Sequence, residues 1–223
     1  MGDRIEIESA DGFRLGAYHA APAGAAKGAV VVIQEIFGVN DHIRQVVDGY
    51  AREGYVAIAP QIFDRVERDV ELGYQEADLT RGVAIAFEQL DHALALQDVQ
   101  AAIDTAAGDG KVGVVGYCFG GLLTWRAACE ARGVTAAVAY YGGGIARETE
   151  RQARCPVMMH FGEKDAHISL DDVAKIRKAQ PAAQVFVYPA DHGFNCDHRA
   201  SFDASSAGLA KQRTLAFFAE HLQ

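Results

Sequence analysis

The sequence lacks an excess of basic residues. Its 223 residues include 21 Lys and Arg against 30 Asp and Glu, which gives a formal net charge of −9 at pH 7. Binding to the phosphate backbone of nucleic acids, or to an anionic lipid surface, depends on clustered Lys and Arg. The composition therefore argues against a nucleic-acid partner and against a protein that binds membrane surfaces.

The sequence also lacks a long apolar segment. Its opening residues, MGDRIEIESADG, carry charges throughout and contain no apolar core of signal-peptide length. No later apolar run approaches the roughly 18 residues of a membrane-spanning helix. From these features we expect a soluble, cytoplasmic protein.

Cysteine is scarce and scattered. The four cysteines form no C-x-x-C pair and lie far apart, at Cys118, Cys129, Cys155 and Cys196. A small disulfide-rich domain has a much denser pattern, so reduced thiols are expected. The chain also has no internal repeat and no Pro- or Ser-rich linker, and half of its residues are apolar. We expect residues 1–223 to form a single domain around one core.

What the sequence does contain is a regular alternation of strand and helix patterns. Residues 4–22 predict an antiparallel hairpin that turns at Asp11-Gly12. The β-branched run GAVVVI is typical of a parallel strand that is buried on both faces. Further strand patterns occupy residues 55–60, 111–117, 136–142, 156–162 and 184–189, and helical patterns occupy residues 41–54, 87–107, 170–179 and 208–223 and the stretch after Cys118. This order predicts an α/β fold with a mostly parallel, doubly wound sheet flanked by helices and an N-terminal antiparallel hairpin.

One charged, weakly periodic segment interrupts the alternation, at residues 64–81. Two interpretations are open for it. A solvated loop or surface helix is the favoured one, and a lid over a pocket is the alternative.

Reactive side chains follow four of the predicted strands. In an open parallel sheet, ligands bind beyond the carboxyl ends of the strands. Glu35, Cys118, Asp165 and His192 each come shortly after a different strand. These four residues are therefore the first candidates for a functional site.

The segment GYCFGG places Cys118 in a G-x-C-x-G pattern between a predicted strand and a predicted helix. This is the form of a nucleophile elbow, in which glycines allow a strained turn and the helix N-terminus favours a thiolate. An isolated pattern of this kind also fits a buried cysteine beside a tight turn. The two interpretations differ in one structural forecast: a nucleophile elbow requires Cys118 to have positive φ.

The order nucleophile, acid, histidine favours catalysis, because it is the order of the α/β-hydrolase triad. His192 is the predicted general base, and Asp165 is predicted to hold its ring in the correct tautomer. His198 is the one serious rival of His192. The remaining candidates are expected to be structural or peripheral, namely His160, His167, Asp171 and Asp172.

Two N–H groups are needed to stabilise the oxyanion of a tetrahedral intermediate. We expect them to be the backbone amides of Phe119 and Ile36. The segment DHGFNCDH contains potential metal ligands, but it has neither zinc-finger spacing nor a distant pair of partner ligands. No metal and no cofactor are expected.

Five motifs in sequence order resemble those of the dienelactone hydrolases, or carboxymethylenebutenolidases: QEIFGVND, GYCFGG, YYGGG, GEKD and DHGF. The resemblance covers nearly the whole chain. It implies an α/β-hydrolase with Cys118 as nucleophile, His192 as base and Asp165 as the orienting acid. It also implies that Glu35 contacts the resting cysteine and helps to generate the thiolate when substrate arrives.

The implied substrate is a small unsaturated lactone that carries a carboxylate, hydrolysed through an acyl-enzyme to a product such as maleylacetate. One departure affects substrate binding. Where relatives have an arginine that binds this carboxylate, the present sequence has Cys196. Arg199 and Arg81 are the alternative cations, and Tyr141 of YYGGG is a further candidate for substrate binding.

Two alternatives to a dienelactone hydrolase stay open. The first is a thiol esterase for other small esters. The second is a non-catalytic redox protein, in which Cys118 senses oxidants or pairs with Cys196. In each case we expect a monomer or a small homo-oligomer.

Overall fold

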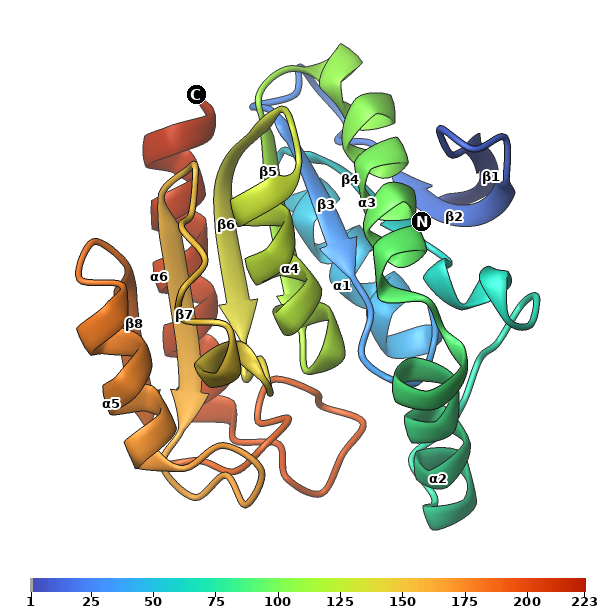
Figure 1. Cartoon of the computed structure of the whole chain (residues 1–223). Coiled ribbons are helices and arrows are strands. Elements are labelled where there is room, and N and C mark those ends of the chain that lie inside the picture. Colours follow the sequence, from blue (N-terminus) through green and yellow to red (C-terminus); the bar gives the residue numbers. More distant parts are fainter. Residues whose placement is uncertain (1) are drawn as a thin grey trace.

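A central β-sheet organises the chain (Figure 1). The computed structural model describes residues 2–223, and across them the sheet has eight strands in the order β1-β2-β4-β3-β5-β6-β7-β8. Strands β1 and β2 form an antiparallel hairpin, β2 pairs antiparallel with β4, and the other pairs are parallel. The bounds are β1 Asp3–Glu8, β2 Arg14–Ala20, β3 Ala29–Ile33, β4 Val56–Pro60, β5 Val112–Tyr117, β6 Val134–Tyr140, β7 Val157–Gly162 and β8 Gln184–Tyr188. The predicted fold class is confirmed.

Helices cover both faces of this sheet. Successive side chains of β3 point to opposite faces. Val30 and Val32 pack in the cluster that contains Val47 of α1 (Asp41–Arg52). Val31 packs in a second cluster with residues of α3 (His92–Ala106) and α4 (Phe119–Glu130). Helix α6 (Ala204–Leu222) lies on the α1 side, and α5 is Leu170–Ala179.

The helix predicted over residues 87–107 is shorter than expected. Residues Ile85–Gln89 form a π-helical turn, and Leu90 is extended with ψ 124°. The side chain of Asp91 then caps α3 by accepting hydrogen bonds from the amides of Ala93 and Leu94. The helical pattern is continuous in the sequence, but an Asp at the N-cap starts a new helix because it satisfies amides that lack intrahelical partners.

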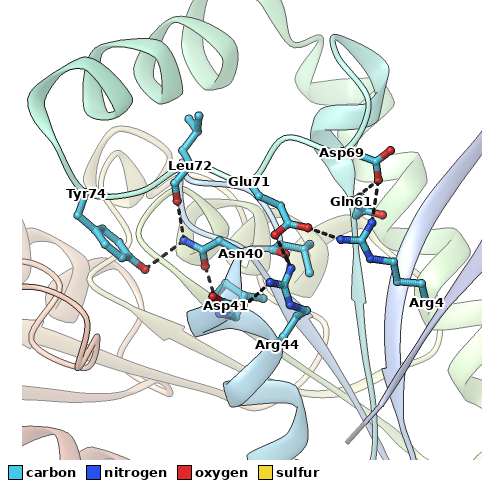
Figure 2. Close-up of polar contacts among 11 residues, drawn as sticks. Arg4, Asn40, Asp41, Arg44, Gln61, Asp69, Glu71, Leu72 and Tyr74 are labelled. Atoms are coloured by element: carbon cyan, nitrogen blue, oxygen red, sulfur yellow. Dashed lines mark hydrogen bonds and ion pairs between the residues drawn. The ribbon is translucent and has the colours of Figure 1, made fainter.

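The segment 64–81 is held against the body of the protein (Figure 2). Asn40, which caps α1, donates hydrogen bonds from its side-chain amide to the carbonyl of Leu72 and the hydroxyl of Tyr74, at 3.0 and 3.2 Å. Glu71 forms ion pairs with Arg44 and Arg4. The surface helix that was expected here is α2 (Glu76–Ala84), and the residues before it are fixed by these contacts.

The carboxyl ends of the parallel strands point to one edge of the sheet. In Figure 1 the arrows of β3, β6 and β7 point to the same end, where α2 and the loop before α6 lie. The loops that carry the candidate site residues all begin at this edge. No helix within residues 2–223 is long and apolar enough to cross a membrane.

Candidate active site

The elbow at Cys118 has the backbone strain that the sequence predicts. Cys118 lies between β5 and α4, with φ 54° and ψ −115°. Non-glycine residues rarely adopt positive φ, and the strain is on the order of 1–3 kcal/mol. A cysteine that only filled the core would not require this conformation, so the forecast for a nucleophile elbow is confirmed.

The flanking glycines are required because other chain segments approach them closely. A Cβ atom on Gly116 would lie 2.1 Å from the carbonyl oxygen of Gly120. A Cβ on Gly120 itself would lie 2.3 Å from the carbonyl oxygen of Ile33, and one on Gly121 would lie 2.7 Å from that of Tyr140. These distances are too short for any larger residue, so the pattern G-x-C-x-G-G follows from steric constraints at the elbow.

His192 and Asp165 form the expected pair. Nδ1 of His192 lies 2.7 Å from Oδ2 of Asp165, and the Asp165 side chain is buried. The other carboxylate oxygen of Asp165 accepts hydrogen bonds from the amides of His167 and Ile168, at 2.8 and 3.1 Å. Both oxygens are therefore engaged, which fixes the carboxylate and, through it, the orientation of the imidazole ring.

The charge of His192 is set by its two neighbours. Burial lowers the pKa of His192, but the charge of Cys118 and the hydrogen bonds with Asp165 and Cys118 outweigh it and raise the pKa to about 10. The imidazole is therefore a cation at neutral pH when Cys118 is a thiolate. This arrangement is an ion pair of the kind that activates a cysteine nucleophile.

The other histidines have different surroundings. His198 packs against the rings of His42 and Tyr74 and does not line the cavity at Cys118. His160 is buried in β7, with its ring nitrogens at hydrogen-bond distance from Tyr188 and Thr214. His167 does line the cavity, with its ring 5.1 Å from that of His192. His192 is therefore the histidine that the fold places with both Asp165 and Cys118.

A cavity of about 420 Å³ opens at Cys118 and His192. Its wall is mainly apolar. The contributing side chains come from the loop after β3, from α2 and the turn after it, and from α4; they include Ile36, Phe37, Leu79, Val83, Phe87, Phe119 and Leu122. Ile36 and Phe119, whose amides are the expected oxyanion donors, thus both border the space where a substrate carbonyl would lie.

Arginine side chains supply positive charge to this cavity. Arg199 lines it, 3.6 Å from Oε1 of Glu35 and over the ring of Phe37. Arg126 also lines it but is engaged by Glu148. Arg147 lines it from the turn after β6 and makes no ion pair within residues 2–223. The sequence analysis did not single out Arg147, because this residue is far from the triad residues along the chain and no motif places it near them.

Arg81 does not lie at the cavity. It points away from the cavity side of α2 and pairs with Glu67 at the protein surface. Leu79 and Val83 of the same helix line the cavity instead. The expectation that Arg81 contacts substrate is therefore corrected: residues two positions before and after it occupy the inner face of the helix, which directs Arg81 outward.

Glu35 and Tyr141 lie behind the cavity rather than in its wall. Glu35 is 1% exposed, and neither of its carboxylate oxygens has a hydrogen-bond partner among residues 2–223, Cys118 included. Tyr141 is fully buried with φ 36°, and its ring lies 5.1 Å from that of His192. Burial, followed by the charge of Glu35, raises the pKa of the Tyr141 hydroxyl well above its usual range. Tyr141 packs against His192 and does not line the cavity, so the expectation that it contacts substrate is corrected.

Comparisons with known proteins show what this chain is similar to. The family model "Dienelactone hydrolase family" matches residues 15–222. A candidate carboxymethylenebutenolidase of Synechocystis sp. PCC 6803 is 36% identical, over 94% of the present chain and 93% of its own length. The carboxymethylenebutenolidase of Pseudomonas putida is 33% identical, over 98% and 97%. The crystal structure of a candidate dienelactone hydrolase from Klebsiella pneumoniae superposes with a TM-score of 0.82 at 34% identity, covering 98% of this chain and all of that one.

Proposed function

Because the chain belongs to the dienelactone hydrolase family and is a carboxylic ester hydrolase for a small lactone or ester, we propose that it acts through a Cys118-His192-Asp165 triad. The observation that carries this proposal is the strained elbow at Cys118, which opens into the same cavity as His192. Asp165 orients the imidazole from the buried side.

In the first half of the reaction, the Cys118 thiolate attacks the carbonyl carbon of the substrate. The oxyanion that forms accepts hydrogen bonds from the amides of Phe119 and Ile36. As the carbonyl re-forms, the bond between the acyl carbon and the ester oxygen breaks, and the imidazolium of His192 gives its proton to that oxygen. For a lactone, the ring opens and both product groups stay in one molecule bound as a thioester.

In the second half, water hydrolyses the thioester. Neutral His192 takes a proton from the water as the oxygen attacks the acyl carbon, and the same two amides stabilise the oxyanion. Collapse of this intermediate releases the carboxylic acid and the Cys118 thiolate. His192 then carries the proton again, so the thiolate–imidazolium pair is restored.

The substrate that fits this cavity has an anionic group and an apolar body. Arg199 and Arg147 can bind a carboxylate, and the side chains from α2 and α4 can pack against a ring. A substrate carboxylate that binds Arg199 would also leave Glu35 without its nearest cation. This change would act on the carboxylate to which the family resemblance assigns a role in thiolate formation.

We further propose a cytoplasmic enzyme that needs no nucleic-acid partner, as a monomer or a small homo-oligomer. The net charge of −9 supports the absence of a nucleic-acid partner, because an acidic protein is repelled by the phosphate backbone.

The triad is tested by hydrolysis of cis- or trans-dienelactone, followed through the loss of its ultraviolet absorbance. We expect turnover by the wild type, no turnover by Cys118→Ala, and wild-type turnover by the matched control Cys155→Ala. Turnover that survives Cys118→Ala would overturn the mechanism. Cysteine-dependent cleavage of neutral aryl esters without lactone turnover would keep the mechanism and assign a thiol esterase; inactivity toward both would favour the redox interpretation.

The carboxylate contact is tested by comparing this lactone with a neutral aryl ester in Arg199→Gln, Arg147→Gln and Arg81→Gln. Loss of a charged hydrogen bond to substrate costs about 1.5–3 kcal/mol, or roughly 10- to 150-fold in kcat/KM. We expect this loss for Arg199→Gln and Arg147→Gln with the lactone only. An equal loss with both substrates, or a loss in Arg81→Gln, would contradict the assignment.

A further inference from the structure

A second group of metal-ligating side chains lies beside the triad. Glu35 follows β3, His42 lies in the first turn of α1, and Cys196 lies in the loop before α6. One potential ligand atom of each residue lies within 4.8 Å of those of the other two. All three residues are buried, at 1%, 3% and 0% exposure. The proposed reaction gives no role to His42 or Cys196, and a metal bound at Glu35 would withhold this carboxylate from thiolate formation.

Two residues of this group have unpaired polar atoms, and the third, Cys196, has its Sγ 3.3 Å from the hydroxyl of Tyr74. Both carboxylate oxygens of Glu35 and Nε2 of His42 are buried without a hydrogen-bond partner within residues 2–223. Folded proteins rarely leave such atoms unpaired, and an unpaired group indicates a missing partner. The nearest cation, the guanidinium of Arg199, is 3.6 Å from Oε1 of Glu35, beyond hydrogen-bond distance. Glu35 and His42 thus place unpaired acceptor atoms within 4.8 Å of the Cys196 sulfur.

The tautomer of His42 is fixed from the opposite side of its ring. Nδ1 lies 3.2 Å from Oδ1 of Asp197, and a carboxylate can only accept at that distance. In the neutral ring, the single N–H then lies on Nδ1, where it donates to Asp197. The lone pair on Nε2 therefore faces Glu35 and Cys196. Histidines that bind metals have this arrangement, with a carboxylate holding the other ring nitrogen.

We propose that Glu35, His42 and Cys196 bind one divalent transition-metal ion of the Zn²⁺ class. A thiolate and an imidazole favour zinc and related ions over Mg²⁺ or Ca²⁺, which need mainly oxygen ligands. Tetrahedral coordination at bond lengths of about 2.0–2.3 Å requires ligand atoms about 3.3–3.8 Å apart. Side-chain movements of about 1 Å bring the three atoms to these separations. On binding, the metal–sulfur bond forms and the Cys196 thiol proton passes to solvent.

A separate cavity of about 380 Å³ lies between α1 and α6 and is lined by His42 and Asp197 but not by Glu35 or Cys196. The sequence argument against a metal in DHGFNCDH rests on the absence of distant partner ligands. The fold supplies two such ligands, because Glu35 and His42 come to Cys196 from the other end of the chain.

The test uses the full-length protein after treatment with a chelator. Because the Cys118 thiolate and His192 can also bind metal, the site is studied in Cys118→Ala, titrated with Co²⁺, which gives a thiolate-to-cobalt charge-transfer band when sulfur is a ligand. We expect one equivalent of Co²⁺ to give this band, and Zn²⁺ to displace it. The band should be absent in Cys118→Ala/Cys196→Ser and retained in the matched control Cys118→Ala/Cys155→Ser.

A second variant and a Tm measurement distinguish the loss of metal binding from a failure to fold. Cys118→Ala/Asp197→Asn retains all three ligands but removes the carboxylate that orients His42. Loss of such a partner typically weakens metal binding about 10- to 100-fold, and we expect a change of that size. Zn²⁺ should also raise the Tm of the Cys118→Ala protein but not that of the Cys196→Ser double variant. A missing band in Cys118→Ala, or a band that survives Cys196→Ser, would overturn the proposal. Neither outcome bears on the esterase triad, because the test does not use turnover.

Discussion

The four cysteines differ in their surroundings, and this difference predicts their reactivity. Burial raises the pKa of Cys129 and Cys155 to about 11 and that of Cys196 to about 12, so all three are thiols at neutral pH. Cys118 instead lies beside the His192 cation at a helix N-terminus. Because the thiolate is the reactive form, we expect iodoacetamide at pH 7 to alkylate Cys118 first, as measured by peptide mass spectrometry. Earlier modification of Cys196 or Cys155 would contradict this.

The charge on His192 predicts a pH dependence. Its pKa is raised to about 10, above the ordinary 6.5, so the imidazole holds its proton across the neutral range. The contribution of the raised His192 pKa to folded-state stability is therefore fully present below pH 6.5 and is lost as the pH rises through about 10. In Cys118→Ala the attracting charge is gone while burial remains. We expect the His192 titration, followed by NMR of its ring proton, to move to lower pH. An unchanged midpoint would show that Cys118 does not set this pKa.

At the scale of elements, the turn between β5 and α4 depends on close backbone contact. In Gly120→Ala the new Cβ would lie 2.3 Å from the carbonyl oxygen of Ile33 and 2.5 Å from that of Gln34. These carbonyl oxygens belong to the backbone and cannot move aside as the end of a flexible side chain can. We therefore expect a loss of at least about 2–3 kcal/mol in the free energy of unfolding. Urea denaturation measures this.

The matched control is Gly208→Ala in α6, where a Cβ meets no atom of residues 2–223 within 4 Å. Alanine in an exposed helix is favoured over glycine by roughly 0.5–1 kcal/mol, so this variant should be slightly more stable than the wild type. If Gly120→Ala were as stable as Gly208→Ala, the elbow would not be sterically constrained.

At the scale of the whole molecule, the prediction of one domain can be tested with a natural probe. Trp125, the single tryptophan, is fully buried in α4 beside the central strands. Its fluorescence reports on the packing of the core, and far-ultraviolet circular dichroism reports on all helices. If the chain unfolds as one domain, the two urea transitions should coincide. Separate midpoints would indicate units that unfold independently.

The sheet also explains why the site could be predicted in part. Each triad residue lies just after a strand, and parallel strands bring such positions to one edge whatever the length of chain between them. Identifying the strands was therefore enough to group Cys118, Asp165 and His192. The choice of Arg81 was wrong because the packing of α2 decides which of its side chains face the cavity, and the sequence does not show this packing. Arg147 was missed because the packing of the turn after β6 likewise decides that it lines the cavity.

The sequence by itself determined the features that depend on local interactions. The β-branched runs predict buried strands, and the G-x-C-x-G pattern predicts the strained turn, because both follow from the sterics of neighbouring residues. Only the tertiary structure decided which distant side chains meet. It brought Glu35 and His42 to Cys196 and directed Arg199 and Arg147 to the cavity. Such contacts depend on how helices and loops pack on the sheet, and the spacing of residues along the chain does not indicate that packing.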